Sequence, residues 1–378
     1  MKYMGSKRAM LSNGLGEMLR AEAVNYSRVV DLFGGASAVS WFAAQELKKP
    51  VLTVDLQTYS AVMARAVLSR TKPIDAEKMW DKWEKVIIKE MHSRPGWKAA
   101  KTLDSKLPNA RTWSKQAREL CASVKVKDAV ICSSYGGYYF SPTQALAFDA
   151  MLRCLPDREP LRSVYLAAII IAASKCAASP GHTAQPFRPT STAGPFLREA
   201  WQRDPINYFH RALLDICPRH ALVRGHTKVG DAVEEAKKLR STDLVFVDPP
   251  YSGVHYSRFY HVLETIARGG CGPVAGDGRY PPFEERPQSS FSNKSESGAA
   301  LTLLLERLAD AGCTVLFTFP ASPCSNGLSG KKIEMEAGKR FVIEKKYVTS
   351  KFSTLGGNNA HRKARARRKE LMLLMRPQ

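Results

Sequence analysis

A carboxylate, two prolines and a tyrosine follow one another at Asp248, Pro249, Pro250 and Tyr251, directly after the apolar run at 244–247. Two consecutive prolines remove two backbone donors and fix two φ angles, so a strand ends here and no ordinary helix turn begins. The Asp248 carboxylate and the Pro249 carbonyl supply two acceptors, and Tyr251 supplies a flat aromatic face. This combination suits a planar ring that carries an exocyclic amino group.

An amino group on an aromatic ring is a poor nucleophile because its lone pair is delocalised into the ring. Two acceptors that hold its two hydrogens favour a pyramidal nitrogen, whose lone pair can then attack an electrophile. This chemistry needs neither a cysteine nucleophile nor a metal ion. The alternative is purely structural: a proline-rich strand exit with a capping aspartate.

Two adjacent glycines, Gly34 and Gly35, follow a short apolar strand at 29–32 within the sequence DLFGGAS. Their spacing differs from G-x-G-x-x-G, but a backbone without side chains lets a ligand approach closely at the start of a helix. The next strand, at 51–54, ends at Asp55, 21 residues after Gly34. A carboxylate there could accept both ribose hydroxyls of a nucleoside, or it could cap the following helix.

These two successive strand–turn–helix units predict an α/β fold with a doubly wound, Rossmann-like parallel sheet. The same pattern returns from residue 230, with strands expected at 241–250 and 312–320 and a closing pair at 340–351 and 369–377. The stretch between them is expected to be mainly helical, with a capping box from Ser141 to Gln144. We therefore expect a split catalytic domain (1–70 and 225–378) with an inserted target-recognition region (71–224). Long loops are expected at 179–196 and 269–298.

The formal net charge of +22 and the pI of about 9.7 point to a polyanionic partner, most commonly nucleic acid. The eight cysteines lack zinc-ligand spacing and are expected to be buried, reduced thiols, so we expect no metal site. The longest apolar run, 164–173, is too short to span a bilayer, and no signal peptide is apparent. A cytoplasmic location without membrane association is therefore expected.

The order of these motifs resembles the D12 class of adenine-N6 DNA methyltransferases, a family that includes the Dam enzymes. Its members begin with a Y/W-x-G-x-K segment, present here as YMGSK at 3–7. The glycine turn, an insertion and DPPY then follow, which is the α arrangement of amino-methyltransferases. Segments 181–187, 256–264 and 353–358 also look like this group.

The resemblance implies S-adenosylmethionine as methyl donor, bound on a methyltransferase sheet, and transfer to adenine N6. It places the cofactor against nine residues: Tyr3, Gly5, Lys7, Asp31, Phe33, Gly34 and Gly35 near the methionine end, Asp55 at the ribose and Asp231 at the adenine. The catalytic group is then 248–251. The strand end at Pro320 lacks the polar residues expected there, so we assign it no role.

The implied partner is double-stranded DNA, from which the target base is flipped into the pocket at a cost of roughly a few kcal/mol. Contacts with DNA are predicted for Lys and Arg residues of 71–120, for Tyr256 and Arg258, for the loop 281–294 and for the basic run 361–369. The tryptophans at 80, 83, 97 and 113 are candidates as well, although a role as core anchors is favoured.

Three alternatives remain open: methylation of cytosine N4, methylation of adenine in RNA, and a catalytically inactive DNA-binding subunit with the same fold. An aspartate at the head of the motif favours adenine over cytosine, whose enzymes more often carry serine there. A cognate restriction or defence-system partner is compatible with the sequence, which does not indicate the recognition site or the oligomeric state.

Overall fold

The computed structural model describes residues 7–352 and 366–378 of the 378-residue chain. Tyr3, Gly5, the segment 353–358 and most of the basic run 361–369 lie outside the described residues. The chain divides into two compact units. We call one of them the sheet unit; it comprises Met4–Lys72, His220–Ser257 and Pro287–Gln378. The other, the helical unit, contains Pro73–Arg219 and Arg258–Arg286.

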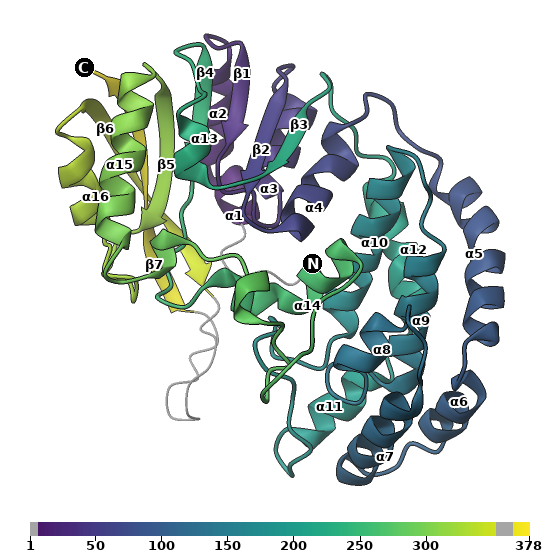
Figure 1. Cartoon of the computed structure of the whole chain (residues 1–378). Helices are drawn as coiled ribbons and strands as arrows, with labels where there is room; N and C mark the ends of the chain where they lie inside the picture. Colours follow the sequence, from purple (N-terminus) through teal and green to yellow (C-terminus); the bar gives the residue numbers. More distant parts are fainter. Residues whose placement is uncertain (1–6, 353–365) are drawn as a thin grey trace. The chain divides into compact units, whose positions relative to one another are not determined.

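A seven-stranded sheet, shown in Figure 1, forms the centre of the sheet unit. Its strand order is β3-β2-β1-β4-β5-β7-β6, and within it β7 alone runs in the direction opposite to the other six strands. The strands are β1 (Arg28–Asp31), β2 (Val51–Asp55), β3 (His226–Val229), β4 (Asp243–Val247), β5 (Thr314–Pro320), β6 (Phe341–Phe352) and β7 (Ala366–Pro377). This mostly parallel mixed sheet is consistent with the methyltransferase fold that the sequence predicts.

Both faces of the sheet carry helices, because the central strands are apolar on both sides. Val30, Val245 and Val315 belong to a core that includes side chains of α13 (Ala232–Ala236), α15 (Ser297–Asp310) and α16 (Gly330–Ala337). Residues that alternate with them, such as Val29 and Leu244, point to the opposite face. There α3 (Ala38–Glu46) and α4 (Thr58–Leu68) contact β1, β2 and β3. Three further segments precede β1: α1 (Arg8–Met10), a kinked segment (Leu11–Leu15) and α2 (Gly16–Ala23).

All six predicted strand regions are confirmed, including the closing antiparallel pair of β6 and β7. The edge strand β3 was not predicted, because its sequence HTKV is short and polar and its side chains are largely exposed. An edge strand has one unpaired side, so it is not required to be apolar. Its place in the sheet comes from its pairing with β2.

The helical unit contains eight complete helices among the described residues. These are α5 (Ala76–Ser93), α6 (Trp97–Ser105), α7 (Ala110–Ser123), α8 (Val130–Tyr135), α9 (Pro142–Arg153), α10 (Leu161–Cys176), α11 (Gly194–Trp201) and α12 (Pro205–Ile216). Most of α14 (Tyr256–Arg268) and a 3-10 turn (Phe283–Glu285) also belong to it. Residues 258–286, which the sequence assigned to the catalytic domain, thus pack within the helical unit. A further 3-10 turn (Ser290–Ser292) lies in the sheet unit.

Local sequence signals account for several of these helices. The capping box is present at Ser141 and Gln144, and the Gln144 amide also donates to the carbonyls of Ala200 and Arg203. The four tryptophans of 71–120 are all buried, so they act as core anchors. No helix within 7–352 and 366–378 combines the length and hydrophobicity that a membrane crossing requires.

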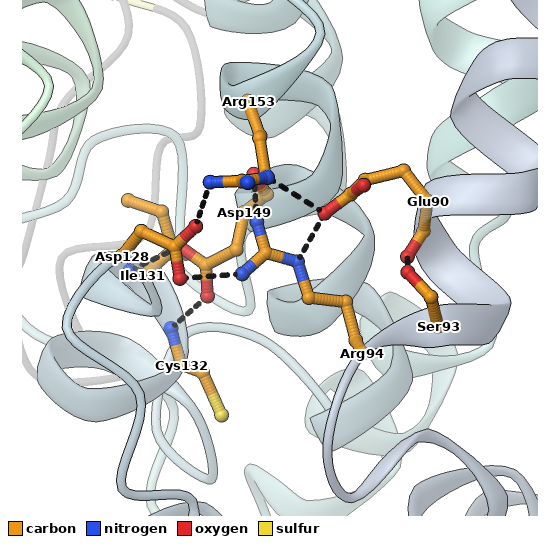
Figure 2. A network of polar contacts seen from close by, with 8 residues as sticks. All are labelled: Glu90, Ser93, Arg94, Asp128, Ile131, Cys132, Asp149 and Arg153. Carbon is orange, nitrogen blue, oxygen red and sulfur yellow. Dashed lines mark hydrogen bonds and ion pairs between the residues drawn. The ribbon is translucent and has the colours of Figure 1, made fainter.

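An ion network ties α5 to α9 inside the helical unit (Figure 2). Arg94, whose side chain is 4% exposed, donates to Asp128 at 2.8 Å and lies 3.3 Å from Glu90. Arg153 bridges the same two carboxylates from the outside and is 60% exposed. The Asp149 carboxylate accepts from two backbone amides at the start of α8, and its carbonyl accepts from Arg94.

We predict that Arg94→Leu destabilises the helical unit by about 2–4 kcal/mol, because it removes a buried cation from two carboxylates. Arg153→Leu serves as the matched control and should cost at most about 1 kcal/mol, because its exposed charge is screened by water. Urea unfolding followed by tryptophan fluorescence reports on this unit, which holds five of the six tryptophans. Equal losses for the two variants would contradict the prediction.

Candidate active site

The carboxyl ends of the five parallel strands β3, β2, β1, β4 and β5 lie next to one another along one edge of the sheet. Asp55 and Asp31 end β2 and β1, Asp248 follows β4, and Asp231 follows β3 after one glycine. The strand order reverses between β1 and β4, and ligands of doubly wound sheets bind at such a switch point. The topology therefore brings together four acidic residues that the sequence singled out.

Asp248, whose side chain is 15% exposed, is held by one hydrogen bond and one ion pair. The Thr318 hydroxyl of β5 donates to Asp248 Oδ1 at 2.9 Å, and Lys7 Nζ lies 3.0 Å from the same oxygen. Burial raises the pKa of Asp248 above its ordinary value, and Lys7 and Thr318 partly offset this effect. A carboxylate at this position is consequently fixed in orientation and poorly solvated.

Lys7 is also close to a second carboxylate, since its Nζ lies 3.6 Å from Glu370 Oε2 on β7. Burial alone would lower the pKa of Lys7, but the attraction of Asp248 and Glu370 outweighs burial and raises it. Lys7 is therefore a buried cation between the buried Glu370 and the partly exposed Asp248. The sequence placed Lys7 near a cofactor, whereas the structure shows its ammonium directly on the DPPY carboxylate.

The remainder of the DPPY segment is held by the loop that follows β5. The buried Asn326 amide donates to the carbonyls of Pro250 and Phe291 at 2.8 and 2.9 Å. The Gly253 amide donates to Ser325 Oγ at 2.9 Å. Tyr251 packs against the sheet core, with its ring edge-to-face to Phe319 at 6.5 Å. The backbone of the motif is thus rigid beyond the constraint of its two prolines.

The glycine turn is packed directly onto β2. A side chain at Gly34 would come within 2.6 Å of Thr53, so only glycine fits there without rearrangement. Gly35 adopts a left-handed φ of 51°, and its amide donates to Asp55 Oδ2 at 2.7 Å. Asp55 Oδ1 accepts from the Gln57 amide at 2.8 Å. These two backbone hydrogen bonds fix the Asp55 carboxylate beside the glycine turn.

Asp31 is almost fully buried beside this turn. Its oxygens accept from Ser40 Oγ at 2.5 Å and from the Phe33 amide at 3.3 Å. Burial raises the pKa of Asp31 to about 7, and the carboxylates of Asp248 and Asp55 add to the effect. The Phe33 ring lies edge-to-face to Phe291 at 5.4 Å.

Asp231 caps the N-terminus of α13, where its Oδ1 accepts from the amides of Val233 and Glu234. The preceding Gly230 amide donates to the Asp55 carbonyl at 2.9 Å, which ties the ends of β3 and β2 together. The capping role explains this aspartate structurally. A ligand role at the second oxygen stays a prediction.

The acceptors at the ends of β1, β2 and β3 fit a nucleoside-type cofactor in their chemistry. A carboxylate oxygen has two lone-pair sites, so Asp55 can accept from hydroxyl groups while it keeps its two backbone donors. The acidic surroundings also favour a positively charged group such as a sulfonium. Among the described residues, no cluster of His, Cys, Asp and Glu gathers as metal ligands would.

Sequence reasoning missed three residues of this site: Thr318, Asn326 and Glu370. We had assigned no role to the strand end at Pro320, yet Thr318, two residues earlier, bonds to Asp248. A threonine inside the apolar run VLFTFP was a signal that could have been used. Glu370 opens the apolar run of β7, but its partner Lys7 is 363 positions away in sequence, so no local pattern indicates the pair.

Asp31 gives a pH-dependent prediction. Because its folded pKa is about 7 and its unfolded pKa is near 3.8, the folded protein binds more protons between these values. The free energy of unfolding should therefore fall as the pH rises from about 4 to 7, by up to a few kcal/mol. Asp31→Asn should remove this part of the pH dependence, measured by urea unfolding at several pH values. An unchanged pH profile in the variant would show that Asp31 is ionised throughout.

Comparison with known proteins agrees with this geometry. The model of the D12 class N6 adenine-specific DNA methyltransferase family matches residues 3–102 and 160–289, which include both the glycine turn and DPPY. The chain is also 30% identical over 118 residues to the type II methyltransferase M.FokI of Planomicrobium okeanokoites. That alignment covers 31% of this chain and 18% of M.FokI. Since the family match extends over more than half of the chain, the protein belongs to the D12 class N6 adenine-specific DNA methyltransferase family.

Proposed function

We propose that the protein transfers a methyl group from S-adenosylmethionine to the N6 amino group of adenine in DNA. The observation that carries this proposal is the rigid DPPY segment at the switch point of the sheet, with the Asp248 carboxylate fixed by Lys7 and Thr318. Family membership supports methyl transfer to DNA, and the aspartate at the head of the motif favours adenine over cytosine as the target base.

Asp248 and the Pro249 carbonyl would accept the two hydrogens of the adenine amine, and Tyr251 would stack against the flipped base. Held in this way, the nitrogen directs its lone pair out of the plane of the ring. The methylated amine must then lose one proton, either to solvent or through Asp248. A carboxylate whose pKa is raised by burial is better suited to receive that proton than an ordinary aspartate.

When bound, S-adenosylmethionine would supply the electrophilic methyl group. We assign Asp31, Phe33, Gly34 and Gly35 to the methionine end of its site, Asp55 to its ribose and Asp231 to its adenine. Tyr3 and Gly5 belong to the same proposed set, although they lie outside the described residues. Lys7 is also assigned to the methionine end of the cofactor site, and through its ion pair it would in addition orient the Asp248 carboxylate.

Double-stranded DNA is the proposed partner, with base flipping as the means of access. The net charge of +22 supports a polyanionic substrate. Within the helical unit, exposed Arg258 stacks on Tyr280 at 4.9 Å and donates to its hydroxyl at 3.0 Å. Arg286 lies over the same ring at 5.5 Å. Guanidinium groups held against an aromatic ring lose less freedom when they bind phosphate.

The decisive experiment incubates the purified protein with labelled S-adenosylmethionine and DNA of mixed sequence, followed by nucleoside analysis. N6-methyladenine is the expected product. Label only in 4-methylcytosine, or only in RNA offered in parallel, would overturn the choice of substrate. Tight DNA binding without transfer would indicate an inactive DNA-binding subunit. Long-read sequencing of a host that expresses the protein would identify the target sequence, and co-purification would test for a restriction partner.

Asp248→Ala should retain cofactor binding and lose methyl transfer, because the amine then has no charged acceptor. Removal of a group that acts in the transition state typically costs a factor of about 10²–10³ in rate. Calorimetric titration with S-adenosylmethionine and a transfer assay measure the two properties separately. Asp310→Ala, an exposed change at the end of α15, is the matched control. Full activity of Asp248→Ala would refute the assigned role.

Arg258→Ala should weaken DNA binding and reduce the slope of log K against log salt by about 0.9 if one phosphate contact is lost. Arg211→Ala removes an exposed cation from α12 in the same unit, outside the predicted contact set, and should leave the slope unchanged. Fluorescence anisotropy with a labelled duplex at several salt concentrations measures both. Equal slopes for the two variants would remove Arg258 from the DNA-contact set.

A further inference from the structure

The two groups that hold Asp248 contact the same carboxylate oxygen. Lys7 Nζ and Thr318 Oγ1 lie 3.0 and 2.9 Å from Oδ1, whereas none of the described side chains forms a hydrogen bond or ion pair with Oδ2. The carboxylate is planar, so fixing one oxygen also sets the direction of the other. Oδ2 is therefore the oxygen available to accept a hydrogen from a substrate amine.

The position of Lys7 depends in turn on Glu370. A lysine side chain has several rotatable bonds, and ordering it costs about 1.5–2 kcal/mol of entropy unless contacts hold it. Glu370 Oε2 lies 3.6 Å from Nζ, and the two side chains are only 4% and 5% exposed. In their ionised forms, Asp248, Lys7 and Glu370 together carry one net negative charge.

The topology explains why a residue so distant in sequence reaches the site. Since β7 runs antiparallel, its amino end lies at the edge where the parallel strands end, and Glu370 pairs with Pro320 at the end of β5. Thr318 stands two residues earlier on β5 and is 1% exposed. Both side chains therefore approach the Lys7–Asp248 pair from neighbouring strands.

We propose that Thr318 and Glu370 are positioning residues, which keep Oδ1 of Asp248 occupied so that Oδ2 faces the substrate amine. Thr318 acts directly on Oδ1, and Glu370 acts through Lys7. The net negative charge of the cluster also complements the positive charge that the amine gains when it is alkylated. This inference rests on the proposed function, because it assigns Asp248 to the amine.

Two isosteric variants should act on Asp248 in opposite directions. Thr318→Val removes a donor from the carboxylate, so the pKa of Asp248 should rise and the acid limb of the rate profile should move to higher pH. Glu370→Gln leaves the Lys7 ammonium to Asp248 alone, so the pKa of Asp248 should fall and the limb should move to lower pH. A residue with a merely structural role would not produce shifts of opposite sign.

The experiment measures single-turnover methyl transfer against pH, with S-adenosylmethionine and DNA affinities measured in parallel. Thr318→Val and Glu370→Gln should each slow transfer about 10- to 100-fold with unchanged affinities, because the acceptor is misplaced rather than lost. Thr318→Ser should recover most of the rate, since it restores the hydroxyl. Glu344→Gln, which removes an exposed carboxylate paired with Arg376 on the same sheet, is the control and should behave as wild type.

A carbon-13 NMR titration of the Asp248 carboxyl in the protein alone gives a second readout that requires no transfer. Opposite shifts of its pKa in the two variants, together with slowed transfer, support the proposal. The positioning role would be overturned if the wild type is active and both variants keep its transfer rate and its Asp248 titration. The proposed function would then still stand. Wild type that transfers no methyl group would overturn the proposed function and, with it, this inference.

Discussion

The ion pair between buried Lys7 and largely buried Asp248 is the interaction on which the rest of the site depends. Removing two charges from water costs several kcal/mol for each ion, and their mutual attraction compensates only when further polar contacts complete the arrangement. Here Thr318 and Glu370 supply these contacts. The pair and its supporting contacts join the N-terminal segment to β4, β5 and β7, so the arrangement depends on all four of these parts of the chain.

Sheet topology converts separate sequence motifs into one site. Parallel strands align their carboxyl ends, so Asp31, Asp55 and Asp248 meet at one edge. The single antiparallel strand brings its amino end to the same edge and adds Glu370. The same geometry concentrates negative charge, which raises the pKa of Asp31 and suits a cationic ligand. The order and direction of the strands therefore determine both the position of the site and its negative charge.

The helical unit has its own core and an ion network centred on the buried Arg94. Five tryptophans and the Arg94 network hold it together. The family match covers its beginning and end but not residues 103–159, where α7, α8 and α9 lie. Under the proposed function, differences in target sequence between relatives would be sought in this segment, because phosphate contacts position an enzyme while base contacts specify its site.

The sequence by itself determined the strand–turn–helix units, the capping box at Ser141, the DPPY strand exit and the family, because each depends on neighbouring residues and on apolar periodicity. It did not predict β3, whose short polar sequence acquires strand structure only through pairing with β2. It also did not predict the roles of Thr318, Asn326 and Glu370. Their partners lie 70, 76 and 363 positions away, so only the tertiary structure could bring them together. No local sequence pattern predicts such a buried charge, because the partner that compensates for its loss of hydration comes from a distant part of the chain.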